Sequence, residues 1–248
     1  FGIINQGSIT VADKGLVALV APGVENRGVI NANLGRVILA SGSTFTIDPY
    51  GDGLIQFATN NKISQTPIGP DGKPMLNSVS NSGAIYAHGG KVMMSANTAA
   101  HIVDNVVNMD GVIEAKSIAE HEGEIILAGG DEGIVSVSGT IDASGKNPGE
   151  KGGKVQITGN LVGLFDKALI DASGDGGGEV LIGGNYQGKG PEQNASAVYM
   201  SPTAIINADA IGYGNGGKVI LWSNDYTGFY GNISARGGAL GGNGGFVE

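Results

Sequence analysis

The chain has 248 residues, and its 14 basic and 23 acidic side chains give a formal net charge of −9, which argues against a cationic nucleic-acid-binding surface. Its 46 glycines exclude a helical domain, because each interior glycine costs a helix about 0.5–1 kcal/mol. Cysteine is absent, which excludes disulfides and thiolate metal sites, and the lack of a long apolar run predicts that nothing spans a membrane.

The first ten residues, FGIINQGSIT, contain no charged leader region, no apolar leader core and no initiator methionine. They do not resemble a targeting segment. We therefore expect an interior piece of a longer protein, with further repeats on both sides.

One phrase recurs along the whole chain: a β-branched pair, a small polar or acidic residue, Ala, a Gly-rich turn, then a charged residue and an apolar run. The recurring isoleucines of this phrase are Ile30, Ile85, Ile113, Ile141, Ile170, Ile206 and Ile233. They lie 55, 28, 28, 29, 36 and 27 residues apart, and an earlier copy begins at Ser8. The period is therefore about 28, and we expect the interval of 55 to hide one further turn and an insertion.

Each period holds three short extended runs separated by Gly, Asn, Asp or Ser, such as TIDAS, KVQIT and LVGLF after residue 139. Inward and outward side chains alternate in each run, as in β-strands. Coils of three strands stack when each strand pairs with its copy in the next coil. The sequence predicts an all-β fold, a right-handed parallel β-helix of roughly eight or nine coils, as a single segment over residues 1–248.

The alternation also predicts the core and two loops. Ile30 and Ala32, with their counterparts in later coils, should point inward from the first strand of the phrase, as should pairs such as Val155 and Ile157 from the second. Three prolines and the lost period mark a loop excursion at about 60–82. A smaller loop at about 186–195 accounts for the interval of 36 residues.

Two outward columns carry charge. Lys91, Glu124, Lys154, Glu179 and Lys218 alternate in sign, which favours the proposed register. Glu114, Asp142 and Asp171 should lie about 5 Å apart in another column, the arrangement in which β-helical polysaccharide lyases and hydrolases gather their acids. This column offers no neighbouring Lys or Arg and no opposed acid, so we expect a solvated face, with cation binding or catalysis as the alternatives.

A third outward column is unusually apolar and forms the predicted contact stripe, Ile38, Met93, Ile126, Leu181 and Ile220. A contiguous apolar area on a protein surface usually marks a contact with another segment, another protein or a ligand. The 60–82 excursion, a neighbouring rod or a ligand could cover the stripe. If it is a contact surface, Ile126→Asp should abolish lateral association and leave the fold intact.

Several short motifs carry little weight. Gly212, Gly214 and Gly217 match a dinucleotide-binding pattern but join two strands with no helix to hold a pyrophosphate. The three histidines share no ligand spacing, so we expect no metal site and no cofactor. Asn194 and Asn232 are formal glycosylation acceptors, and the sequence does not tell whether either is modified.

The phrases GLVALVAPGVENRGVINANLGRVILASG and GGKVILWSNDYTGFYGNISARGGALGGNGGFVE resemble the large exoproteins of bacterial two-partner secretion, the filamentous haemagglutinin family. They are similar to the repeats that follow that family's secretion domain. The resemblance implies a Gram-negative adhesin, secreted or at the cell surface, that an outer-membrane transporter exports unfolded. The secretion domain's N-P-N type motifs are missing, so the resemblance implies that this domain lies upstream.

These observations favour a non-catalytic rod of a secreted adhesin, which contacts a host surface, neighbouring cells, a biofilm polysaccharide or its own copies through many weak interactions. Two alternatives stay open. One is a filament subunit that polymerises through its coil ends or sides. The other is a polysaccharide lyase or hydrolase on the same fold, since the fold alone does not choose between them.

Overall fold

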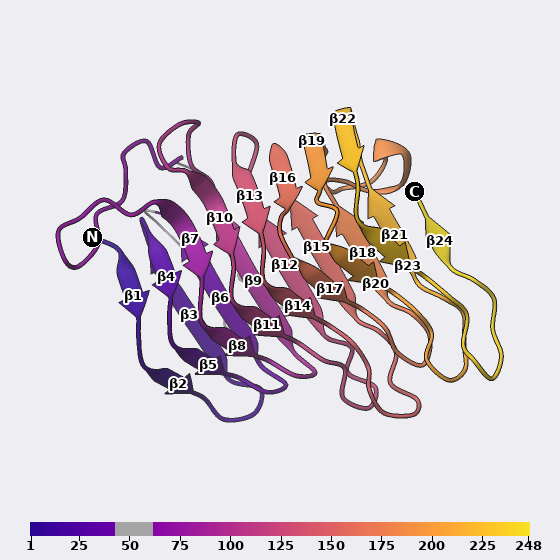
Figure 1. The fold of residues 1–248 in the computed structure, drawn as a ribbon. Helices are drawn as coiled ribbons and strands as arrows, with labels where there is room; N and C mark the ends of the chain where they lie inside the picture. Colours follow the sequence, from indigo (N-terminus) through magenta and orange to yellow (C-terminus); the bar gives the residue numbers. More distant parts are fainter. Residues whose placement is uncertain (43–61) are drawn as a thin grey trace.

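The computed structural model describes residues 1–42 and 62–248. In this part of the chain, 24 strands form three parallel sheets of eight strands each. One strand from each sheet makes a coil, and the eight coils stack along one axis with the two termini at opposite ends (Figure 1). The predicted right-handed parallel β-helix is confirmed.

The strands of the three sheets follow one another in strict rotation. Sheet A contains β1 (Ile3–Asn5), β4 (Val24–Asn26), β7 (Asn77–Asn81), β10 (Asn105–Met109), β13 (Ile134–Val137), β16 (Leu161–Leu164), β19 (Ala195–Met200) and β22 (Ser223–Phe229). Sheet B contains β2 (Ser8–Thr10), β5 (Val29–Asn31), β8 (Ala84–Tyr86), β11 (Val112–Glu114), β14 (Thr140–Asp142), β17 (Leu169–Asp171), β20 (Ile205–Asn207) and β23 (Asn232–Ser234). Sheet C contains β3 (Leu16–Ala21), β6 (Arg36–Ser41), β9 (Lys91–Ala96), β12 (Glu124–Ala128), β15 (Lys154–Thr158), β18 (Glu179–Ile182), β21 (Lys218–Leu221) and β24 (Phe246–Val247).

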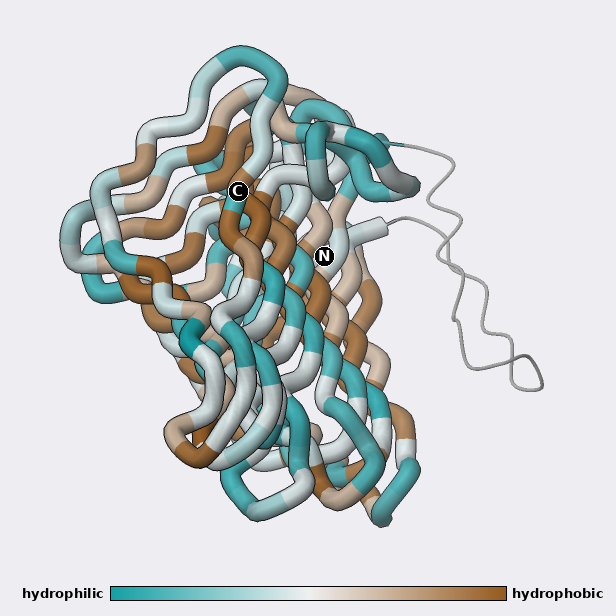
Figure 2. The backbone as a smooth tube through the Cα atoms, turned by 90° about the vertical axis from the view of Figure 1, so that its right-hand side faces the viewer, coloured by the Kyte–Doolittle hydropathy of each residue, from teal (hydrophilic) through white to brown (hydrophobic). Residues whose placement is uncertain are grey.

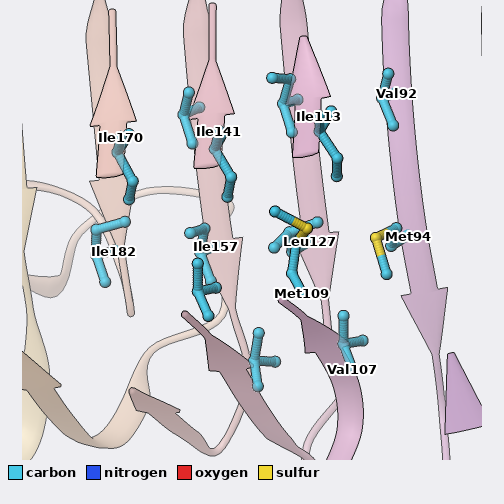
Figure 3. Packing of buried hydrophobic residues seen from close by; sticks show 14 of the residues in the cluster. Val92, Met94, Val107, Met109, Ile113, Leu127, Ile141, Ile157, Ile170 and Ile182 are labelled. Atoms are coloured by element: carbon cyan, nitrogen blue, oxygen red, sulfur yellow. The ribbon is translucent and has the colours of Figure 1, made fainter. Parts of the chain in front are cut away.

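The core consists of columns of like side chains, as the repeat predicts. The isoleucine column of sheet B pairs residue for residue from β2 to β23, and its members from Ile30 to Ile206 are fully buried. Val155 and Ile157 of β15 are fully buried too. Figure 3 shows these columns facing one another across the interior, with Ile113, Ile141 and Ile170 opposite Leu127, Ile157 and Ile182.

The expectation of a further turn between Ile30 and Ile85 was wrong. β5 pairs directly with β8 and places Ile30 opposite Ile85, so the two residues lie in adjacent coils. The interval of 55 residues therefore holds an insertion and no additional coil in the described residues. Residues 1–42 and 62–248 form eight coils, in agreement with the predicted eight or nine.

The expected excursion at 60–82 is only partly irregular. Residues 60 and 61 lie outside the described residues, residues 62–76 lack regular strands, and Asn77–Asn81 forms β7 of sheet A. The described part packs toward sheet A, where a Cβ added to Gly2 or Gly23 would lie 2.3 or 2.6 Å from the sulfur of Met75. The smaller loop runs from Gly183 to Asn194 and contains a single 3-10 turn, η1 (Tyr186–Gly188), before β19.

A polar ladder lies inside the first three coils. The amide of Asn5 donates to Asn26, and that of Asn26 donates to Asn81, each over 2.7 Å. Asn26 and Asn81 are completely buried, so these hydrogen bonds satisfy groups that would otherwise be costly in the core. The next residue of the column is Met109, where the apolar part of the same column begins.

The coils match in register over the whole length. Figure 2, viewed from the C-terminal end, shows hydrophobic and hydrophilic segments of successive coils lying behind one another. Within the described residues, no helix is long and apolar enough to cross a membrane. The outward columns and the turns are therefore the places at which to look for function.

Candidate functional site

The three acids of the predicted carboxylate ladder lie opposite one another in adjacent strands of sheet B. Glu114 pairs with Asp142, and Asp142 with Asp171. The expectation that this column has no basic neighbour was wrong. Lys116 lies 2.8 Å from Glu114 and 3.4 Å from Asp142, and Lys146 lies 2.7 Å from Asp171. Both lysines come from the turns after the strands, where strand alternation does not predict side-chain positions.

Two members of these ion pairs, Lys116 and Asp171, have shifted pKa values. Burial alone would lower the pKa of Lys116, but its hydrogen bond to Glu114 and the charge of Asp142 outweigh burial and raise the pKa. Burial would raise the pKa of Asp171, whereas hydrogen bonds from Lys146 and Ser173 outweigh it and lower the pKa. Both shifts favour the charged forms of Lys116 and Asp171.

Asp142 and Asp171 also close the turns that lead out of sheet B. The Oδ1 atom of each accepts hydrogen bonds from the backbone N–H and the hydroxyl of the serine two residues later, Ser144 or Ser173. Asn207 accepts from the N–H of Asp209 in the same way. The recurring Asp-Ala-Ser of the sequence is therefore a turn motif, which accounts for two of the three acids without catalysis.

The predicted contact stripe lies on the outer face of sheet C, with Ile38, Met93 and Ile126 in adjacent strands and Leu181 and Ile220 further along. Gln156 stands between Ile126 and Leu181 and interrupts the apolar column. Its exposure is uneven: Leu181 and Ile220 are fully buried, and Ile38 is 6% exposed. Met93 and Ile126 are half-buried. Ile38 forms a small buried cluster with Ala40, against which Met93 packs.

The Gly183–Asn194 loop covers the C-terminal part of the stripe. Asn185 accepts a hydrogen bond from Lys218, and Tyr186 packs edge-on against Phe246 with ring centroids 5.4 Å apart. Gly188 lies so close to Trp222 that an added Cβ would come within 2.6 Å of the indole nitrogen. Lys218 and Trp222 flank Ile220 on the same face, so the loop lies over Ile220. Sequence reasoning expected the 60–82 excursion, a rod or a ligand here instead.

The alternating charged column of sheet C forms in the predicted register. Lys91 binds Glu124 over 3.0 Å, and Glu179 binds both Lys218 at 3.0 Å and Lys154 at 3.7 Å. A shallow groove of about 660 Å³ runs beside this column over paired glycines. Of the charged residues that line the groove, Lys154 and Lys218 share Glu179 as a partner.

No three His, Asp or Glu side chains gather closely enough to hold a metal ion in residues 1–42 and 62–248. The two formal glycosylation acceptors differ in their surroundings. The amide nitrogen of Asn194 donates to the carbonyl of Gly188 within the loop, whereas Asn232 begins β23 and is exposed.

Comparisons with solved structures show what the chain is similar to. The chain is similar to the HMW1 secretion domain from Haemophilus influenzae, with 32% sequence identity and a TM-score of 0.79. The likeness covers 99% of this chain and 60% of that one, so the chain spans about three fifths of the neighbour's length. No protein-family model and no curated protein matches the chain.

Sequence reasoning missed a group of aromatic residues on the outer face of sheet A. Phe165, Tyr199, Tyr226 and Tyr230 lie around β16, β19 and β22, and the nearest rings are 5.6 and 5.8 Å apart. The segments LVGLF, AVYM and YTGFY each carry an aromatic residue, but Phe165, Tyr199 and Tyr226 stand at different positions of the repeat, and Tyr199 lies opposite glycines. Strand periodicity does not predict the group, because its rings do not share one column of the repeat.

Proposed function

We propose that the chain is a non-catalytic β-helical rod segment of a secreted Gram-negative exoprotein, exported by two-partner secretion through an outer-membrane transporter. The likeness to a secretion domain along nearly the whole chain carries this proposal. The resemblance of the repeats to the filamentous haemagglutinin family supports it independently.

The same likeness bears on where the segment belongs in its parent protein. The sequence resemblance implied a position after the secretion domain. Similarity to a secretion domain over 99% of the chain favours a position within that domain, as part of its β-helix. We propose the latter, with the whole chain as one continuous β-helical unit.

The paired state of the acids supports a structural role. Glu114, Asp142 and Asp171 each bind a lysine, and two of them close turns as well. A polysaccharide lyase or hydrolase needs an acid and a base that are free to exchange protons with substrate. The rod instead supplies length and repeated surfaces for adhesion to a host surface, to polysaccharide or to other copies.

Removing one whole coil from the parent protein tests the rod proposal. Val112 and Thr140 occupy equivalent positions, so deletion of residues 112–139 rejoins β8 to β14 in the native register. We expect the shortened protein to fold and to be exported by the transporter like the wild type. Deletion of residues 112–125, half a coil, is the control, and it should abolish folding because core positions then fall on the wrong sheets.

Two results would contradict the proposal. Accumulation of the parent protein outside cells that lack the transporter would exclude two-partner export. Release of shortened sugar chains from a polysaccharide by the wild-type protein would show that the rod is an enzyme. Ordered polymers of the native protein in electron micrographs, in place of isolated thin fibres, would favour the filament alternative.

A further inference from the structure

Aromatic residues and glycines alternate on the outer face of the last three coils. Tyr199 of β19 lies between Gly163 of β16 and Gly228 of β22 in the same outward column. The neighbouring rings fold back over these glycines. A Cβ at Gly163 would lie 2.2 Å from the ring of Phe165, and one at Gly228 would lie 2.9 Å from the hydroxyl of Tyr226.

The rings form one continuous surface, here called the aromatic platform and made of Phe165, Tyr199, Tyr226 and Tyr230. The ring centroids of Phe165 and Tyr199 are 5.6 Å apart, and those of Tyr199 and Tyr230 are 5.8 Å apart. The hydroxyls of Tyr226 and Tyr230 lie 3.2 Å from each other. Each ring thus packs against at least one other ring of the platform, and such packing lowers the entropic cost of ordering the side chains on binding.

Three of the four rings are exposed to solvent: Phe165 is 40% exposed, Tyr226 55% and Tyr230 57%. Tyr199, between them, is half-buried. These side chains point away from the core, so they contribute little to its burial. Four aromatic rings held together on a water-facing sheet are therefore the kind of surface that marks a contact site.

The chemistry of the platform selects among partners. The charged residues next to it in the chain are Asp166, Lys167 and Asp225, all exposed, with two negative charges against one positive. This balance opposes nucleic acid, anionic lipid and acidic sugar chains, which need clustered basic residues. Flat rings bordered by hydroxyls suit a ligand with an apolar face and a hydroxylated rim. A pyranose ring has both.

We propose that the aromatic platform binds a neutral polysaccharide, with sugar rings stacked on Tyr199, Tyr226 and Tyr230 across adjacent coils. The inference rests on the proposed role in adhesion and names a ligand class for it. It does not depend on how the protein is exported.

Affinity electrophoresis with immobilised polymers tests this inference. The probes are hydroxyethyl cellulose, starch, glucomannan and xylan as neutral polymers, with polygalacturonate and phosphatidylglycerol vesicles as anionic comparisons. We expect at least one neutral polymer to retard the intact chain. The double variant Tyr226→Ala/Tyr230→Ala should bind that polymer about tenfold more weakly, because two stacking surfaces are lost.

Tyr213→Ala is the matched control, since Tyr213 is 61% exposed and lies outside the platform. It should bind like the wild type, and all variants should keep the wild-type melting temperature. The inference is overturned if no neutral polymer retards the protein, if the double variant binds as tightly as the wild type, or if only the anionic probes bind. None of these outcomes affects the export and coil-deletion experiments. The rod proposal is therefore tested independently of polysaccharide binding.

Discussion

Two columns of glycine set the spacing between coils. One precedes the strands of sheet B, where a Cβ on Gly28, Gly83, Gly111 or Gly139 would lie 2.0–2.2 Å from the carbonyl oxygen of the glycine in the coil before. The other precedes the strands of sheet C and behaves in the same way at Gly153, Gly178, Gly217 and Gly245. Glycine is required at these positions by the close approach of neighbouring backbones.

Alanine at such a position should therefore push two coils apart. We expect Gly139→Ala to lower the free energy of unfolding by about 1–3 kcal/mol, the usual cost of overpacking. Thermal or urea denaturation followed by circular dichroism measures the change. Gly244→Ala is the control, because a Cβ there meets nothing within 4 Å, and it should be neutral or slightly stabilising. Equal losses in both variants would refute the argument.

Asp209 gives stability a pH dependence. Burial would raise its pKa, but hydrogen bonds from Arg236 and Ser234 outweigh burial, and the pKa lies below its usual value. A carboxyl whose pKa is lower in the folded state stabilises the fold fully above its unfolded pKa of about 3.9. This contribution is lost as the pH falls through the folded pKa.

We therefore expect the melting temperature of the wild type to fall below about pH 4, and Asp209→Asn to weaken this fall while lowering stability at pH 7. Scanning calorimetry between about pH 2 and 7 would measure both effects, because this range extends to both sides of the pKa of about 3.9 of an aspartate in the unfolded chain. Asp225→Asn, a change to an exposed carboxylate, should leave the curve unchanged. An unaltered pH curve in Asp209→Asn would contradict the assignment.

At the scale of single elements, the Gly183–Asn194 loop divides the apolar stripe into two parts. Leu181 and Ile220 lie beneath the loop and belong to the protein's interior, although strand alternation places them on the outer face. Ile126 is half-buried on the same column. A lateral partner could therefore reach Ile126 more easily than the residues under the loop.

A charge introduced at these two positions should have different effects. Leu181→Asp buries a carboxylate without a partner and should cost about 3–5 kcal/mol of unfolding free energy. Ile126→Asp should cost about 1 kcal/mol or less, because its carboxylate reaches water. Comparing the urea midpoints of the two variants tests where the loop-covered part of the stripe ends. The assignment of Leu181 to the covered part and Ile126 to the open part would be wrong if Ile126→Asp unfolded the protein and Leu181→Asp did not.

For the whole molecule, the repeat sufficed to predict the fold class, the three strands per coil and the inward columns, because one period of the pattern specifies every coil. The interval between Ile30 and Ile85 was misread, since the length of a loop carries little information about which strands pair. Lengths in sequence alone could not tell an extra coil from an insertion.

The surface was less predictable than the core. The carboxylate column was identified from strand alternation, but Lys116 and Lys146 reach it from turns that have no fixed periodicity. The cover over Leu181 depends on where an irregular loop packs, and the aromatic platform depends on rings of neighbouring coils that meet although they stand at different positions of the repeat. Such features arise from contacts between coils, and the repeat constrains them only weakly.

The buried asparagines make the first three coils chemically different from the later ones, although all share one backbone shape. Each amide needs another amide above or below it, whereas beyond Met109 the corresponding positions hold Val137, Leu164 and Met200. A coil transplanted from one end of the molecule to the other would therefore bring either an orphaned amide or a methyl group among amides. Coils with the same backbone shape are therefore not interchangeable. A coil can be duplicated only next to coils that carry the same type of side chain, amide or apolar, in this column.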